Sequence, residues 1–110
     1  SNIVIYKYNL FLEGIQVENI TKEMEQLKAK SEILKGLAHP IRLCIVRGLM
    51  DEEGCNVSHM QDCLDIPQST LSQHLAKLRN LDILEGERNG VEVNYFVVSE
   101  DAKKVVEALF

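Results

Sequence analysis

Residues 66–79, with the sequence IPQSTLSQHLAKLR, constrain the fold of this chain more than any other segment. Leu71, Leu75 and Leu78 recur at the i, i+4, i+7 spacing that places side chains on one face of an α-helix. Pro67 stands where this helix would begin, and its missing N–H is not needed there because the first N–H groups of a helix have no intrahelical partner. The segment therefore predicts a helix that buries one leucine stripe.

The other side of this predicted helix is rich in short amide and hydroxyl side chains over its first two turns. They are Gln68, Ser69, Thr70, Ser72 and Gln73. Such side chains donate and accept hydrogen bonds, which suits the donor and acceptor code that base edges present in the major groove of DNA. All five are candidate DNA contacts, and the positive end of the helix dipole favours a nearby phosphate. The alternative is an ordinary surface helix that is rich in serine and glutamine.

The residues before this helix predict a second, shorter helix. Ser58 and Gln61 fit a capping box, with Ser58 at the N-cap and Gln61 three residues later. Met60, Cys63 and Leu64 would form the apolar face of this helix. Two short helices joined by a tight connection, the second with a polar exposed face, indicate a helix-turn-helix.

The residues after the helix predict a β-hairpin. Asn89-Gly90 separates two extended runs, 83–88 and 91–98, and Asn-Gly between such runs is a strong hairpin signal. A helix-turn-helix followed by a hairpin is a winged helix. Arg88 is next to the hairpin tip, where it could reach a phosphate or a narrow minor groove.

The charge balance opposes a DNA-binding function. The formal net charge is −5, whereas DNA-binding domains are usually basic. Residues 58–98 carry six acidic side chains against three basic ones, Lys77, Arg79 and Arg88. Hydroxyls, helix N-termini and backbone N–H groups also contact phosphates, so we expect modest non-specific binding with a shallow salt dependence. Glu85 and Glu87 on the wing should point away from the duplex.

Taken together, these segments resemble the ArsR/SmtB family of winged-helix repressors. The resemblance is carried by His39-Pro40-Ile41-Arg42-Leu43, by residues 68–75, by Leu78-Arg79, by Arg88-Asn89-Gly90 and by Tyr95, and it covers roughly residues 32–109. It implies a homodimer that binds an inverted repeat near a promoter and is released by an inducer. It also implies that Gln68, Ser69, Ser72 and Gln73 read DNA and that Arg88 is the wing contact. His74 lies between Leu71 and Leu75, so we expect a half-buried packing side chain there.

The resemblance bears on metal sensing as well. Metal-responsive members carry a Cys-x-Cys pair at the start of the first helix of the helix-turn-helix, or Asp and His ligands along the last helix. Those cysteine positions fall on Asn56 and Ser58 here, and the last helix has Asp101 but no histidine. We therefore expect no metal site of the usual family kinds and no cofactor.

The three cysteines leave a thiol switch as the stronger sensing hypothesis. Cys55 and Cys63 are the candidate redox residues, and Cys55 follows an acidic loop that should expose it. Cys44 and Cys63 both fall on predicted apolar faces, where a cysteine is usually an inert small hydrophobe. An organic inducer, or none at all, stays open.

The remaining helices would supply scaffold and dimer surface. A first helix within 19–37 has an apolar stripe that needs a partner, a second begins at His39-Pro40, and a third, 100–109, has Ser99 as N-cap. The inward residues expected for the second helix are Ile41, Cys44, Ile45 and Leu49. The stripe of the last helix (Ala102, Val105, Val106 and Leu109) would pair with the first helix across a two-fold axis. The predicted fold class is mainly α with a small β-hairpin, in the order α-α-α-α-β-β-α.

The first sixteen residues are expected to form an N-terminal arm, separate from a domain that spans 17–110. Residues 3–12 form an apolar, strand-like run, and Ser1-Asn2 looks like a tag remnant. Residues 12–17 can be encoded by a ribosome-binding site followed by GTG, so natural translation from Val17, with a non-native leader before it, is an alternative to a genuine arm.

Composition excludes several classes of protein. No apolar run approaches the ~20 residues that span a bilayer, and nothing marks secretion, so a cytoplasmic location is expected. His39, His59 and His74 fall at helix-start or packing positions, with no nucleophile–base–orienter set and no phosphate loop beside them, so an enzyme is not expected. The competing class is a winged-helix protein-interaction module without DNA binding. Such a module should show apolar or aromatic anchors where the chain has Gln68, Ser69, Ser72 and Gln73.

Overall fold

The computed structural model describes residues 3–6, 9, 17–51 and 55–110, and for residues 17, 18 and 55–58 it describes the backbone alone. Its contacts divide the chain into two units, Ser1–Ser31 and Glu32–Phe110. The second unit contains the predicted helix-turn-helix and hairpin.

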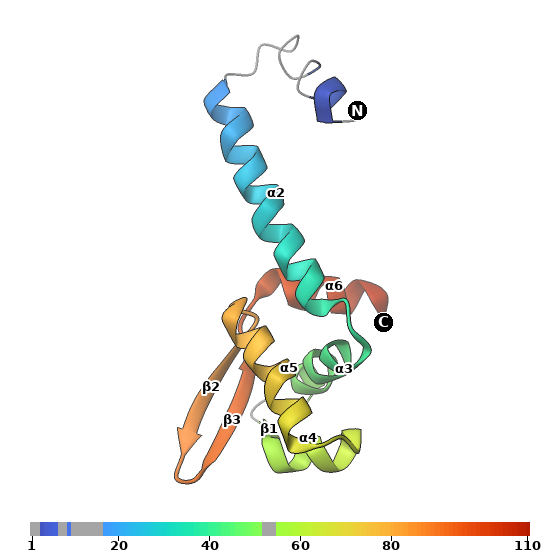
Figure 1. Ribbon diagram of the computed structural model, residues 1–110, viewed down its shortest axis with the longest axis vertical. Helices are drawn as coiled ribbons and strands as arrows, with labels where there is room; N and C mark the ends of the chain where they lie inside the picture. Colours follow the sequence, from blue (N-terminus) through green and yellow to red (C-terminus); the bar gives the residue numbers. More distant parts are fainter. Residues whose placement is uncertain (1–2, 7–8, 10–16, 52–54) are drawn as a thin grey trace. The chain divides into compact units, whose positions relative to one another are not determined.

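From Val17 onward, the helices and strands follow the predicted order with one addition (Figure 1). They are α2 (Val17–Leu37), α3 (Pro40–Asp51), β1 (Cys55–Asn56), α4 (Val57–Leu64), α5 (Gln68–Asn80), β2 (Leu84–Asn89), β3 (Glu92–Val97) and α6 (Glu100–Leu109). The α4 and α5 helices form the helix-turn-helix, and β2 and β3 form the wing. The expected fold class, a mainly helical winged helix-turn-helix, is confirmed.

The addition is β1, which makes the wing part of a three-stranded antiparallel sheet in the order β1-β3-β2. Cys55 pairs with Tyr95 and Asn56 with Asn94. A two-residue strand has no periodicity to detect in a sequence. Its pairing with β3 ties the start of α4 to the wing.

The hairpin turn lies one residue later than Asn-Gly chemistry predicts. Asn89 pairs with Glu92, so the two loop residues are Gly90 and Val91. An Asn-Gly type I′ turn needs positive φ at both central residues, whereas here Gly90 has φ 67° and Asn89 belongs to β2. The turn thus has glycine at its first central position, as type II′ turns do.

One hydrophobic core holds the second unit together. The three stripe leucines of α5 (Leu71, Leu75 and Leu78) are at most 2% exposed, as predicted. They pack in one cluster with Val46 and Leu49 of α3 and with residues of the sheet. Ala102 and Val106 add the inner face of α6, whose N-terminus is capped by Ser99, because its hydroxyl accepts a hydrogen bond from the Ala102 N–H at 3.1 Å.

Two expectations about individual residues in the second unit are wrong. The α4 helix begins at Val57, so Ser58 lies inside it rather than at its N-cap, and the Ser58 side chain lies outside the described residues. Cys44 and Cys63, expected on buried faces, are both exposed free thiols. Val46 occupies the core on α3 instead of Cys44, because the inward face of this helix is rotated from the one expected.

The first unit also differs from expectation. Residues 3–6 are helical rather than strand-like, and the Tyr6 hydroxyl donates a hydrogen bond to Glu23 Oε1 at 2.9 Å. The rest of the expected apolar run, residues 7–8 and 10–12, lies outside the described residues. In the described part of the chain, no helix is long and apolar enough to cross a membrane.

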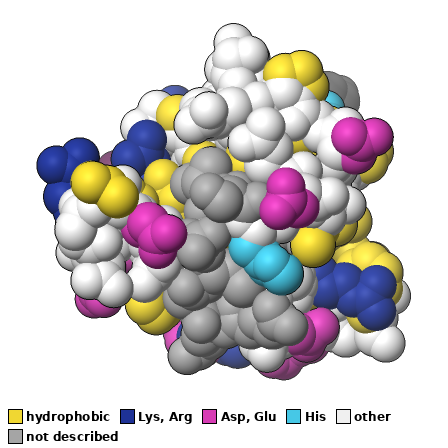
Figure 2. All heavy atoms as spheres, turned by 90° about the horizontal axis from the view of Figure 1, so that it is seen from below, with side chains coloured by type: hydrophobic (Ala, Val, Ile, Leu, Met, Phe, Trp, Pro, Cys, Tyr) yellow, Lys and Arg dark blue, Asp and Glu magenta, His cyan; other side chains and the backbone are white. Residues whose placement is uncertain are grey.

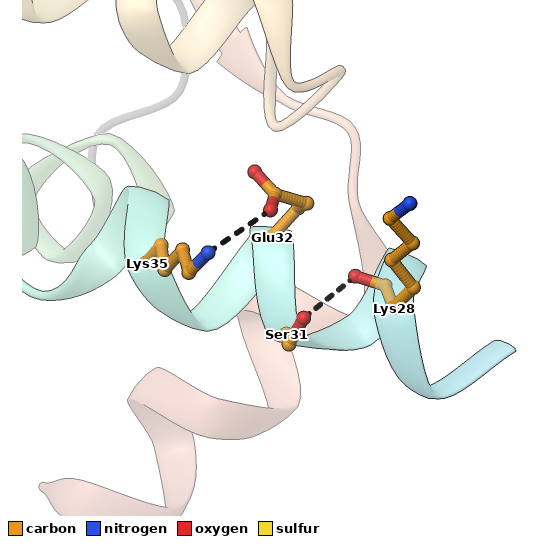
Figure 3. Close-up of polar contacts among 4 residues, drawn as sticks. All are labelled: Lys28, Ser31, Glu32 and Lys35. Carbon is orange, nitrogen blue, oxygen red and sulfur yellow. Dashed lines mark hydrogen bonds and ion pairs between the residues drawn. The ribbon is translucent and has the colours of Figure 1, made fainter. Parts of the chain in front are cut away.

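Polar side chains of α2 bond to their own helix. The Ser31 hydroxyl donates to the Lys28 carbonyl at 2.8 Å, and Lys35 Nζ lies 3.3 Å from Glu32 Oε1 (Figure 3). Apolar α2 side chains stay uncovered in this single chain, since Leu27 is 48% and Leu34 52% exposed.

The turn that leads into α5 gives a test of the fold. Asp65 has φ 51°, a left-handed conformation that aspartate and glycine tolerate better than β-branched residues do. Asp65→Val is expected to lower the free energy of unfolding by about 1–2 kcal/mol, the usual cost of that conformation for an L-residue with a Cβ. Asp65→Gly should leave it nearly unchanged. Urea denaturation measures both, and an equal loss in the two variants would contradict the backbone explanation.

Candidate nucleic-acid interface

The polar side of α5 faces solvent. Gln68, Ser69, Ser72 and Gln73 are exposed, whereas Thr70 is half-buried. The burial of Leu71 and Leu75 fixes this orientation, because residues on the opposite side of a helix must then point outward. Four of the five candidate residues therefore form one exposed surface of amides and hydroxyls, which we call the α5 polar face (Gln68, Ser69, Ser72 and Gln73).

The α5 N-terminus adds backbone donors beside this face. Pro67 is the N-cap residue, and its carbonyl accepts the first helical hydrogen bond from the Leu71 N–H at 3.1 Å. No side chain caps the helix, and its first turn contains no acidic residue. The N–H groups of the first turn therefore remain available to an anion, and they add to the positive end of the helix dipole.

The register of the wing places its charges on two different faces. Cross-strand partners share a face, and successive residues alternate between faces. Arg88 pairs with Val93, on the face that carries buried Leu84 and Tyr95 nearer the core. The opposite, outer face carries Glu85, Glu87 and Glu92 together with Asn89. Arg88 is exposed and forms no ion pair with another residue that the structure describes.

Arg42 connects α3 to the end of α2 and to α5. From α3, its Nε donates to the Gly36 carbonyl and its Nη2 to the Lys35 carbonyl at 3.3 Å, so it binds the last turn of α2. Its Nη1 lies 3.4 Å from Nδ1 of His74 on α5. The His74 ring also packs on the His39 ring, with 4.4 Å between centroids. His74 is half-buried, as predicted, and its partners Arg42 and His39 are far from it in the sequence.

The surroundings of His74 disfavour its protonated form. Its pKa is lowered from the ordinary value, first by burial and then by the charges of His39 and Arg42. The Arg42 contact has the same requirement, because a guanidinium N–H needs an unprotonated imidazole nitrogen as its acceptor.

The described side chains near the helix-turn-helix do not form a continuous basic patch. Seen from below the view of Figure 1, lysine and arginine side chains are separated by acidic ones (Figure 2). This agrees with the expected excess of acidic residues. Contacts to phosphate would then depend on Arg88, the hydroxyls of α5 and backbone N–H groups rather than on net charge.

Of the two candidate redox cysteines, the structure describes the side chain of Cys63. The Cys55 side chain lies outside the described residues, and so do those of Asn56 and Ser58 at the usual metal-ligand positions. Cys63 is exposed on α4, with Sγ 3.9 Å from Nε2 of His59. Among the described residues, no three His, Cys, Asp or Glu side chains are grouped so that they could hold a metal ion.

Comparison with known proteins agrees with this geometry. Residues 37–87 match a family model described as a helix-turn-helix domain. The transcriptional repressor PagR of Bacillus anthracis is 37% identical over 87 residues, which are 79% of this chain and 87% of that protein. The biofilm growth-associated repressor of Xylella fastidiosa is 34% identical over 96 residues, 86% of this chain and 83% of that protein.

Solved structures are similar over the same region. The crystal structure of PagR has a TM-score of 0.73 at 36% identity and covers 79% of this chain and 99% of its own. Reduced HlyU from Vibrio cholerae has a TM-score of 0.72 at 35% identity and covers 80% of this chain and 93% of its own.

A winged helix-turn-helix with an amide- and hydroxyl-bearing second helix defines a DNA-binding transcriptional regulator. Within that class, the level of identity to PagR shows that the chain belongs to the ArsR/SmtB family of winged-helix repressors.

The depressed His74 pKa predicts a pH dependence of stability. The unfolded chain takes up the His74 proton near the usual pKa of about 6.5, and the folded chain does so at lower pH. The stabilisation is therefore complete above about pH 6.5 and is lost as the pH falls through the folded pKa. Urea denaturation between pH 8 and 5 should show a steeper fall for the wild type than for His74→Gln. Parallel curves would refute the assignment to His74.

Proposed function

We propose that this chain is a homodimeric repressor that reads an inverted repeat with the α5 polar face of each protomer. The observation that carries the proposal is the exposure of Gln68, Ser69, Ser72 and Gln73 opposite a fully buried leucine stripe. Amides at such positions bind adenine edges in pairs of hydrogen bonds. Thr70 is half-buried and would contribute through its hydroxyl at the margin of the interface.

Arg88 is the proposed wing contact. It lies near the hairpin tip on the face opposite Glu85 and Glu87. A guanidinium there can bind a phosphate or enter a narrow minor groove while the carboxylates point away from the duplex. The strand register therefore supports the expectation that Glu85 and Glu87 point away from the duplex.

The uncovered apolar side chains support a dimer built from α2 and α6. Leu27 and Leu34 on α2, and Leu109 on α6, are between 48% and 62% exposed in the single chain. An apolar stripe of this kind needs a partner, and a second copy of residues 17–110 supplies it in this proposal. Residues 1–16 are proposed as an arm outside this domain, and the cytoplasm, where the chromosome is, as the location.

We propose repression rather than activation, because PagR and the Xylella protein are both named repressors. A relative from Vibrio cholerae, 36% identical over 89 residues, is instead named a transcriptional activator. The relatives are regulators, and no enzymatic role is proposed. Cys63 and Cys55 remain the proposed redox-sensitive residues.

Fluorescence anisotropy with the DNA upstream of its own gene tests the reading helix. Gln68→Ala/Ser72→Ala is expected to weaken binding by roughly 10- to 100-fold, because a good base contact is worth about 1–3 kcal/mol. Asn80→Ala, exposed at the far end of α5, is the matched control and should bind normally. No binding above a scrambled duplex at low salt, with or without reductant, would favour the protein-interaction module.

The wing is tested by the salt dependence of the same titration. Arg88→Ala should weaken binding to all sequences alike and reduce the slope of log K against log salt by about 1. Glu87→Gln, one residue away on the outer face, should leave binding unchanged or slightly stronger. A larger loss with Glu87→Gln would mean that the outer face, and not the Arg88 face, meets the DNA.

A further inference from the structure

A cavity of about 300 Å³ lies between α3 and α4. Its apolar wall includes Leu49 and Met60, both buried. The volume is at the lower end of the range for small-molecule pockets. In α3, Gly48 lines it, and a Cβ built at this glycine would meet nothing within 4 Å. A larger side chain at Gly48 would therefore enter the cavity without meeting a neighbouring atom at its Cβ.

Two thiols and an imidazole face this same cavity. Cys44 lines it from α3, and His59 and Cys63 line it from α4. His59 and Cys63 are one helical turn apart, with Nε2 3.9 Å from Sγ, so the imidazole is placed to take the thiol proton. The cavity is open to solvent and Asp51 also lines it, but most of its lining is apolar. No three His, Cys, Asp or Glu side chains among the described residues are grouped to hold a metal ion, so a cavity with a nucleophile and a base suits a small apolar electrophile better than a cation.

We propose that the α3–α4 cavity binds small α,β-unsaturated carbonyl compounds and that Cys63 adds to them covalently. The thiol proton passes to His59 Nε2, and the sulfur forms a bond to the β-carbon of the ligand. The electron pair of the carbon–carbon double bond moves to the α-carbon, which takes the proton back from His59. The adduct contains every atom of both reactants, so the addition needs no oxidant and no second substrate.

An adduct in this cavity could change the position of the helix-turn-helix, because α4 lines the cavity and is joined to α5. Residues 65–67 join the end of α4 directly to the start of α5, and α4 also packs on α5. A ligand held between α3 and α4 would shift the first helix of the helix-turn-helix relative to the core. This regulatory consequence rests on the proposed DNA-binding function, whereas the covalent addition does not.

Cyclohex-2-en-1-one is the probe, applied to the full chain and followed by intact-mass and peptide mass spectrometry. The expected result is a single adduct at Cys63, formed at a rate that saturates with probe concentration. Cyclohexanone has the same ring and carbonyl but no conjugated double bond, and it should slow the addition by competition. Rates that rise linearly with concentration and are equal at Cys44 and Cys63 would overturn the proposal.

Two variants separate the parts of the site. His59→Gln should slow addition at Cys63 by about tenfold or more, since general-base assistance contributes roughly 10²–10⁴ in rate. Gly48→Leu should fill the cavity and abolish saturation, with its thermal unfolding recorded to show that it folds. A full rate in both variants would mean that Cys63 reacts as an ordinary surface thiol.

The regulatory part has its own readout. Enone-treated wild type should bind the upstream DNA at least about tenfold more weakly, a change of 1.4 kcal/mol, while treated Cys63→Ser should bind as before. An adduct that leaves the affinity unchanged would overturn the regulatory part alone. Normal DNA binding without any adduct would overturn the cavity proposal and leave the proposed function standing.

Discussion

The burial of Leu71, Leu75 and Leu78 is the constraint on which the rest of this structure depends. With these side chains at most 2% exposed, α5 has one possible rotation about its axis, and every residue between them is assigned to solvent or to the margin. The core that receives the leucines is built from α3, the sheet and α6. The same packing that stabilises the domain therefore turns the α5 polar face toward solvent. The hydrogen-bonding groups of α5 become exposed on one surface when the domain folds.

The sequence predicted the features that depend on periodicity and turn chemistry. The leucine spacing, the short first helix of the helix-turn-helix, the hairpin and the Ser99 cap all follow from local patterns, and the structure has each of them. The hairpin turn was misplaced by one residue because Asn89-Gly90 suits a type I′ turn by itself, while the pairing of the strands decides which two residues form the loop. The strand β1 was missed because its two residues have no pattern of their own.

Long-range geometry accounts for what the sequence left out. Nothing local shows that the Arg42 guanidinium reaches the carbonyls at the end of α2 and the His74 ring. Cys44 and Cys63 look like core residues by spacing, yet both thiols are exposed beside a cavity. On α3, Val46 is buried in place of Cys44. For the candidate DNA contacts, the exposure of Gln68 and Ser72 agrees with the pattern, and their roles in binding remain predictions.

The two-faced wing has a consequence for how a duplex can approach. Glu85, Glu87 and Glu92 share the outer face, and Arg88 has the other. A phosphate backbone brought against the outer face would meet three like charges with no cation among them, so repulsion excludes that pose before any base is read. The acidic residues that make the net charge unfavourable for DNA binding would then restrict the direction from which a duplex can dock. Part of the specificity would come from the orientations that they exclude.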